Sequence, residues 1–204
     1  MAMLERAVGL VLASESSFRR KLMESAGLTC ESLGAPIDES AIGGDGPIEL
    51  AIARAQAKAR SVHALRPTHC VVGADQVVHL DGRIFHKPTS SAEWKVQLQA
   101  LSGRTHELVT AVCVVWPDEE ETFCVHSKVR FRADLGDSDL DAYIEWGEAS
   151  ACAGGYMVEG RGAWLIESVE GDWNNVIGLP ILPLIGRLRA RGWRLTPSGW
   201  GALP

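Results

Sequence analysis

The chain has 204 residues, of which 46% are hydrophobic and 23% are charged, an ordinary balance for a soluble globular protein. Its formal net charge of -6 argues against a nucleic-acid-binding protein, because such a protein needs a basic face for phosphates. No apolar run approaches the roughly 18–20 residues that cross a bilayer, which argues against a membrane protein. Five scattered cysteines without a CxxC spacing favour a reducing compartment. We therefore expect one cytoplasmic domain over residues 1–204, without a linker.

The first half of the chain predicts two helices, a strand and a hairpin. An apolar run rich in β-formers indicates a buried strand at Val8–Ala13, and Ser14–Ser17 is suited to cap a following helix. The alanine-rich stretch Pro47–Leu65 predicts a long helix. The sequence GADQVVHLDGRIFHKP, Gly73–Pro88, predicts a β-hairpin that turns at Asp81-Gly82.

The second half of the chain predicts three helices and three strands. In order, these are a helix at 91–101, strands at 106–116 and 121–132, a helix at 136–146 capped by Asp137 or Ser138, a strand at 164–169, and a last helix opened by Pro180 and Pro183. Strands and helices mix without regular βαβ alternation. We therefore expect an α/β fold with a mixed twisted sheet and flanking helices.

Polar side chains stand at several places where the local pattern predicts apolar or neutral residues. Where the first strand meets its helix, Ser14 and Ser16 together with Arg19 form a candidate anion site at a helix N-terminus. A plain serine cap with a surface arginine is the alternative. In the loop APIDES, Asp38 and Glu39 are paired acids that ordinarily face solvent. They gain a role as Mg²⁺ ligands if another acid converges on them.

The predicted hairpin places an acid and a lysine where an apolar strand is expected. Asp75 interrupts the strand, and Lys87 lies in the return segment. A buried acid without a partner is costly, so Asp75 should meet a metal, a lysine or a catalytic water. Lys58 lies on the alanine-rich helix and is a solubilising residue unless it points into a cleft. Together, cations for phosphate and acids for a divalent metal suit phosphoryl chemistry on a nucleotide.

A series of short motifs occurs in a recognisable order: LASESSFRRKLMESAGL, DES, AKA, GADQVV, HKP, LSGRTHELVTAV and GDWNNVIGLP. This series, from Leu12 to about Leu188, resembles the Maf family of nucleoside triphosphate pyrophosphatases. The resemblance implies two lobes around a cleft and a fold related to inosine triphosphate pyrophosphatases. It also implies hydrolysis of a nucleoside triphosphate to monophosphate and pyrophosphate, with Mg²⁺ or Mn²⁺, in a cytoplasmic protein that is often a homodimer.

The resemblance further implies roles for individual residues. Asp75 matches the family's proton acceptor, and Glu39 matches an acid of the metal and catalytic cluster, so both are candidate ligands of the divalent cation. The cleft positions that hold phosphates are matched by Ser14, Arg19, Lys58 and Lys87, with Lys87 also assigned to the catalytic group and Ser16 to substrate binding. Whether Asp38 or Asp172 joins the metal site stays open at this point.

Three positions that select the base in this family carry Phe18, Gln76 and Glu159, which resemble the branch acting on 7-methylguanosine triphosphate. That branch typically has Trp at the first position. A positively charged 7-methylguanine can stack on Phe18, and Glu159 can accept hydrogen bonds from its N1 and N2 edge. Gln76 can both donate and accept. Because LSGRTHELVTAV looks like the pyrimidine branch, an enzyme that prefers dTTP and UTP, or a broad one, is the alternative.

A non-catalytic nucleotide-binding regulator of cell division is the alternative from another class. Glu39, Lys58, Asp75 and Lys87 speak against it, since a pure binder has no need of a water-activating acid. The expected partner is a small nucleotide rather than nucleic acid or a membrane.

Overall fold

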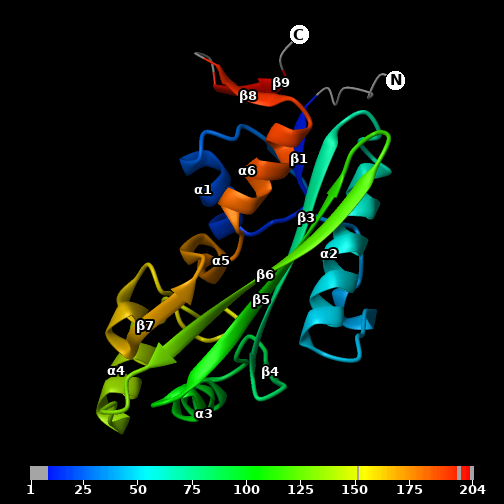
Figure 1. Cartoon of the computed structure of the whole chain (residues 1–204). Coiled ribbons are helices and arrows are strands. Elements are labelled where there is room, and N and C mark those ends of the chain that lie inside the picture. The colour runs from blue at the N-terminus through cyan, green and yellow to red at the C-terminus, as the bar shows by residue number, and fades with distance from the viewer. Residues whose placement is uncertain (1–8, 151, 197–198, 203–204) are drawn as a thin grey trace.

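The computed structural model describes residues 9–150, 152–196 and 199–202, and Val8 of the first predicted strand lies outside them. Within these residues, one sheet has the strand order β2-β1-β3-β5-β6-β7, with β4 pairing to β3 (Figure 1). Its strands are β1 (Leu10–Leu12), β2 (Glu31–Ser32), β3 (Cys70–Leu80), β4 (Arg83–Phe85), β5 (Thr105–Val115), β6 (Glu120–Phe131) and β7 (Ile166–Gly171). β1 runs parallel to β2 and β3, whereas the pairs from β3 to β7 are antiparallel, so the predicted mixed sheet is confirmed.

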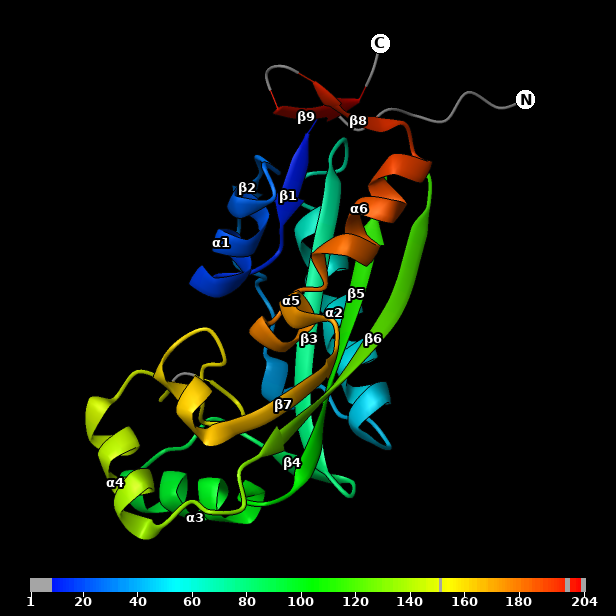
Figure 2. The same ribbon diagram turned by 60° about the vertical axis from the view of Figure 1, so that its left-hand side comes forward.

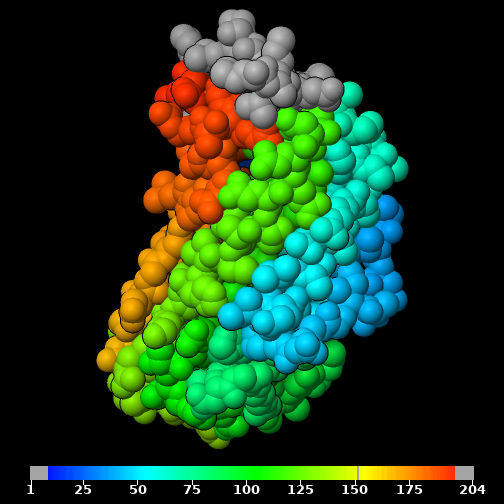
Figure 3. Space-filling model, turned by 45° about the vertical axis from the view of Figure 1, so that its right-hand side comes forward, coloured from blue at the N-terminus to red at the C-terminus, as the bar shows by residue number. Residues whose placement is uncertain are grey.

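The helices cover both faces of this sheet. They are α1 (Ser17–Ser25), α2 (Pro47–His63), α3 (Ser91–Leu101), α4 (Asp137–Trp146), α5 (Trp173–Ile177) and α6 (Ile181–Ala190), with 3-10 helices at Glu39–Ala41 and Arg161–Leu165. Successive side chains of a strand point to opposite faces, so odd-numbered residues of β3 and β5 pack on α2. Even-numbered ones pack on α1 and α6 near the start of β3 and in the core with α3 and α4 at its other end. Figure 3 shows α2 in blue and cyan beside the green surface of β6.

Two lobes form on the sheet face opposite α2. One lobe packs α1 and α6 on β1 and the start of β3, and the other packs α3 and α4 on the far ends of β3, β5 and β6 (Figure 2). Each lobe has its own buried apolar core, containing Met23 and Leu184 in the first and Leu98 and Phe131 in the second. The predicted two-lobed α/β arrangement is therefore confirmed.

The helix and strand boundaries follow the turn chemistry with two exceptions. Asp81 and Gly82 have φ values of 52° and 83°, as the predicted two-residue hairpin turn requires. Capping of α4 by Asp137 or Ser138 was a wrong prediction. The helix begins at Asp137 itself, and the Asp139 carboxylate accepts from the Gly136 N–H at 2.8 Å.

The second exception lies before β7. We predicted a strand from Trp164, but Arg161–Leu165 forms a 3-10 helix and the strand begins at Ile166. Trp164 is 78% exposed, and because aromatic residues favour strands mainly through packing in a half-buried sheet, its strand propensity has no effect here. The short helix α5 and the separate hairpin of β8 (Trp193–Thr196) and β9 (Gly199–Ala202) were not anticipated. Among the described helices, none combines the length and apolarity of a bilayer span.

One edge of β3 is left unpaired in its middle. On that edge β3 pairs with β1 through Cys70–Val72 and with β4 through Val78–Leu80, which leaves Gly73–Val77 without a strand neighbour. The opposite edge pairs with β5 over this whole stretch. At Gly73, a Cβ would lie 2.5 Å from the Ala55 carbonyl oxygen, so only glycine lets α2 pack this closely. The polar residues that interrupt the apolar strand thus lie at a gap between two neighbouring strands.

Candidate active site

A cleft of about 800 Å³ opens at the unpaired stretch of β3. Its walls come from the turn between β1 and α1, from α2, from the β4 hairpin and from the segment between α4 and α5. Ten of the side chains that the sequence singled out line it: Ser14, Ser16, Phe18, Arg19, Glu39, Lys58, Asp75, Gln76, Lys87 and Glu159. The fold therefore brings together residues that are far apart in the sequence.

A lysine bridges the two acids at the centre of the cleft. The Lys58 ammonium nitrogen lies 2.7 Å from Asp75 Oδ1 and 2.8 Å from Glu39 Oε2. Lys58 and Asp75 are each only 6% exposed, whereas the Glu39 side chain is half exposed. The second Asp75 oxygen, Oδ2, is buried and has no hydrogen-bond partner among the described residues. Of the three partners expected for Asp75, the protein itself supplies the lysine and leaves one enclosed oxygen free.

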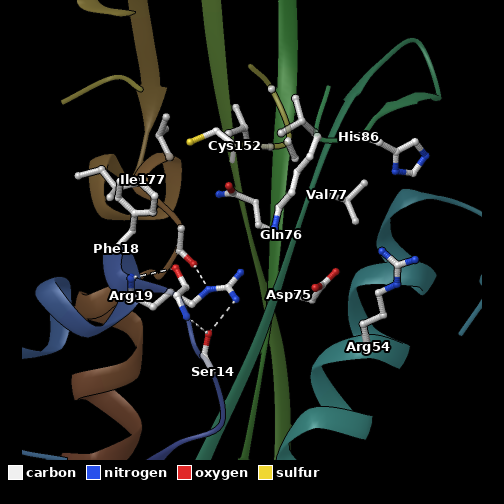
Figure 4. Close-up of a pocket in the computed structure, with 18 of the residues that line it drawn as sticks. Ser14, Phe18, Arg19, Arg54, Asp75, Gln76, Val77, His86, Cys152 and Ile177 are labelled. Carbon is white, nitrogen blue, oxygen red and sulfur yellow. Dashed lines mark hydrogen bonds between the residues drawn. The ribbon is translucent and has the colours of Figure 1, made fainter. Parts of the chain in front are cut away.

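The turn from β1 into α1 adds a guanidinium beside these acids. Arg19 donates from Nε to the Gly178 carbonyl at 2.9 Å and from Nη1 to Ser14 Oγ at 3.5 Å (Figure 4). Burial lowers the pKa of Arg19, and the negative charges of Asp75 and Glu39 oppose this only in part, which shows that the guanidinium lies within electrostatic reach of both acids. The turn therefore combines a cation with a helix N-terminus.

Ser16 serves as the cap of α1. Its hydroxyl oxygen accepts from the Arg19 N–H at 3.4 Å, and its own N–H donates to Ser14 Oγ. Ser16 therefore caps the helix as one interpretation of the sequence predicted, and this role does not prevent the turn from binding an anion, as the other interpretation predicted.

The sequence reasoning missed Arg54, which also lines the cleft. Arg54 lies one helical turn before Lys58 on α2, and Figure 4 shows its guanidinium reaching into the cleft across from Asp75. Its Nε is buried without a hydrogen-bond partner within the described part of the chain. Lys87 likewise lines the cleft without a hydrogen bond or ion pair to any described residue. The cleft thus offers two cations to an anionic ligand without breaking an internal ion pair.

Asp75 and Gln76 point to opposite faces of the sheet, as neighbours on a strand must. Asp75 meets Lys58 of α2 on one face. On the other face, the Gln76 amide nitrogen donates to Thr110 Oγ1 at 3.1 Å and to the Asn175 carbonyl of α5. Both amide protons are therefore used inside the protein. Gln76 was expected to donate as well as accept, but in this structure only its oxygen is left for a ligand.

The other two predicted base-selecting residues, Phe18 and Glu159, also line the cleft. Figure 4 shows the Phe18 ring beside Ile177 of α5. Burial raises the pKa of Glu159 above its usual range. Burial also raises the pKa of the Cys152 thiol to about 11, with a further rise from Glu159 and an opposing effect of Lys87. Glu159 and Lys87 thus both lie within electrostatic reach of Cys152 in the cleft wall.

The two further acids left open by the sequence do not line the cleft. Asp38 accepts from the N–H and the hydroxyl of Ser40, and Asp172 caps α5 by accepting from the Asn175 N–H at 2.8 Å. No cluster of three or more His, Cys, Asp or Glu side chains with metal-binding geometry occurs in the described residues. Of the four acids that the sequence proposed for a metal site, only Glu39 and Asp75 line the cleft.

These features define a two-lobed α/β protein whose cleft surrounds an enclosed carboxylate with cations, an arrangement suited to a polyanionic substrate. The chain belongs to the Maf family, because residues 9–191 match the family model described as Maf-like protein. The resemblance seen in the sequence is thereby confirmed.

Comparison with known proteins gives relatives of two specificities. The chain is 38% identical over 192 residues to a dTTP/UTP pyrophosphatase of Symbiobacterium thermophilum, covering 94% of this chain and 98% of that protein. It is 39% identical over 191 residues to a 7-methyl-GTP pyrophosphatase of Rhizobium meliloti, covering 90% and 96%. Among solved structures, the Ham1 protein of Staphylococcus aureus matches 61% of this chain and 72% of its own, with 18% identity and a TM-score of 0.43.

Proposed function

We propose that this protein hydrolyses a nucleoside triphosphate to the monophosphate and pyrophosphate in the described cleft. The observation that carries the proposal is the enclosed Asp75 carboxylate, which has one oxygen on Lys58 and the other free. A base held in one orientation beside cations is what water attack on a phosphoric anhydride needs. The names of the relatives, pyrophosphatases in both cases, support the same reaction.

In the proposed reaction, a water attacks the α-phosphorus and forms a new P–O bond. Asp75 Oδ2 takes the proton of that water, while Lys58 holds Oδ1 and so fixes the direction of the free oxygen. The bond from the α-phosphorus to the bridging oxygen breaks, and its electron pair leaves with pyrophosphate. Arg54 and Lys87, which lack internal ion pairs within the described residues, neutralise the charge that develops on this leaving group.

The donor set of the cleft fits a divalent cation. Mg²⁺ and Mn²⁺ prefer carboxylate and phosphate oxygens, and Mg²⁺ commonly takes one or two carboxylates with the rest from substrate and water. The half-exposed Glu39 would be one such carboxylate, and Asp75 would be the second through an oxygen that is not acting on the attacking water. When bound, the cation would supply neutralisation of phosphate charge. Removing it with a chelator and adding back Mg²⁺ or Mn²⁺ should abolish and then restore turnover.

We further infer that the preferred base is guanine, methylated at N7, with dTTP or UTP as the competing assignment. Three cleft side chains support this: Phe18 offers a flat ring for a cationic base, and Gln76 and Glu159 offer acceptor oxygens for its N–H edge. The relatives do not decide between the two assignments, since both specificities occur at nearly equal identity.

Two measurements test the proposed function. Pyrophosphate release from 7-methyl-GTP, GTP, dTTP, UTP and CTP gives the base preference, and a clear preference for dTTP over the methylated purine would refute the specificity. Asp75→Asn should lower kcat by about 1,000-fold or more, in the range for loss of a general base, while nucleotide still binds. Turnover that survives this substitution would refute the mechanism, and a wild type that only binds nucleotides would favour the regulator.

A further inference from the structure

The orientation of the Gln76 amide is fixed by its neighbours. Its nitrogen donates to the Asn175 carbonyl and, at 3.1 Å, to Thr110 Oγ1. A carbonyl can only accept, so turning the amide over would bring two oxygens together. The Gln76 carbonyl oxygen is therefore the one group that this side chain can offer to a ligand in the cleft.

The two acceptors that fix Gln76 are buried and firmly held. Thr110 on β5 and Asn175 on α5 are both fully buried. The Asn175 side chain donates to Ser127 Oγ of β6 at 2.9 Å, and the Asp172 N–H donates to the same oxygen at 3.1 Å. The first turn of α5 is thus tied to the sheet, which holds the Asn175 carbonyl against Gln76.

Building on the proposed function, we propose that Thr110 is a positioning residue: it holds the Gln76 amide in place while the Asn175 carbonyl sets its direction, so that the cleft selects a base edge with two adjacent donors. Thr110 does not line the cleft itself and acts through the Gln76 amide. Glu159 provides the second acceptor in the same cleft. Among the bases compared, the guanine edge that carries the N1–H and the 2-amino group fits the two acceptors Gln76 and Glu159.

Base chemistry distinguishes this edge from the competing ones. Guanine presents the N1–H and the 2-amino group side by side, whereas hypoxanthine keeps the N1–H and lacks the amino group. Uracil and thymine present one N–H between two carbonyl oxygens, and those oxygens would face the acceptors of Gln76 and Glu159. An unpaired or opposed polar group in a partly buried site is costly, so the order of affinity should be guanine, hypoxanthine, uracil.

The test uses binding rather than turnover, so that it remains decisive whatever the hydrolytic activity. Calorimetry gives Kd for the α,β-imido analogues of GTP, ITP and UTP with the wild type, Thr110→Val and Thr110→Ser. The matched control is Thr122→Val, because Thr122 also accepts from a glutamine amide, that of Gln56 at 3.2 Å, and neither residue lines the cleft. The hydrolysis panel is run separately and tests the proposed function alone.

We expect the wild type to bind the GTP analogue about tenfold or more tighter than the UTP analogue. Thr110→Val should reduce that ratio by about fivefold or more through weaker GTP binding, with the UTP analogue unchanged. Thr110→Ser should restore the ratio, and Thr122→Val should leave it unaltered. The inference is overturned if the wild type shows no guanine preference, if Thr110→Val keeps the ratio, or if it weakens all three analogues equally.

Discussion

The ion pair between Lys58 and Asp75 should be strongly coupled, and removing the lysine alone should cost more than removing both charges. Lys58→Met keeps the length of the side chain but leaves the Asp75 carboxylate buried without its cation. Asp75→Asn leaves Lys58 with Glu39, which is half exposed. The double variant removes both charges of the pair and leaves an apolar chain beside an amide.

The magnitude follows from the geometry. With the two atoms 2.7 Å apart, Coulomb attraction at an effective dielectric constant of about 20 amounts to roughly 6 kcal/mol. Desolvation of both groups, each 6% exposed, offsets much of this gain. Leaving one buried charge unpaired nevertheless costs about 3–5 kcal/mol. We therefore expect Lys58→Met to lower the free energy of unfolding by that amount and the double variant to recover about 2 kcal/mol or more of it.

Urea unfolding at neutral pH, followed by far-UV circular dichroism, gives all four free energies of the cycle. The matched control is Arg66→Met, which removes the exposed pair between Arg66 and Glu31 and should cost far less than Lys58→Met. If the effects of Lys58→Met and Asp75→Asn simply add, the two groups do not form the buried pair described here.

Three further outcomes are expected. Arg54→Met should lower kcat/KM by about 10²- to 10³-fold without loss of stability. The control Arg60→Met, on the exposed side of α2, should leave kcat/KM unchanged, and equal effects of the two variants would show that Arg54 does not act on the substrate. Because burial raises the pKa of Glu159, acidification protonates this acceptor at a higher pH than an exposed glutamate. The ratio of kcat/KM for the guanine substrate to that for the uracil substrate should therefore fall at low pH in the wild type and stay constant in Glu159→Gln. Parallel pH profiles of the two proteins would contradict this. Burial lowers the pKa of His106 to about 4. Between pH 6.5 and pH 5 the unfolded chain therefore protonates this histidine while the folded chain keeps it neutral, and the free energy of unfolding should drop by about 2 kcal/mol. In the double variant His106→Phe and Tyr156→Phe, which removes both partners of the buried hydrogen bond, this pH-dependent drop should disappear. Urea unfolding at each pH measures it, and a drop of the same size in the double variant would contradict the assignment to His106.

The sequence could predict part of the chemistry in the cleft from local signals, and the family resemblance supplied the rest. A polar residue inside an apolar strand marked Asp75, and the turn from a strand into a helix marked Ser14 and Arg19. The serines before α1 and the Asp81-Gly82 turn likewise located the start of that helix and the turn of the hairpin. These features depend on neighbouring residues only, which is why they can be read without the fold.

The remaining features depend on contacts between distant segments. Nothing local shows which face of α2 meets the cleft, so Arg54 reads as one more helix arginine until β3 is packed beside it. Gln76 and Asn175 are 99 positions apart, and only their contact shows that the amide protons are already used. The boundary of β7 was missed for a related reason, since Trp164 carries strand propensity without the burial that makes it effective.

The unpaired stretch of β3 also provides a built-in reporter of ligand occupancy. The hydrogen bonds of β1 to Cys70 and Val72 show that even-numbered residues of β3 direct their main-chain groups toward this edge. By alternation, the N–H groups of Ala74 and Gln76 point into the gap, whereas that of Asp75 points toward β5. In amide hydrogen exchange, the first two should exchange quickly between slow neighbours and become protected when a nucleotide fills the cleft. Two backbone protons would thus follow binding at the site directly, without a labelled substrate and without turnover.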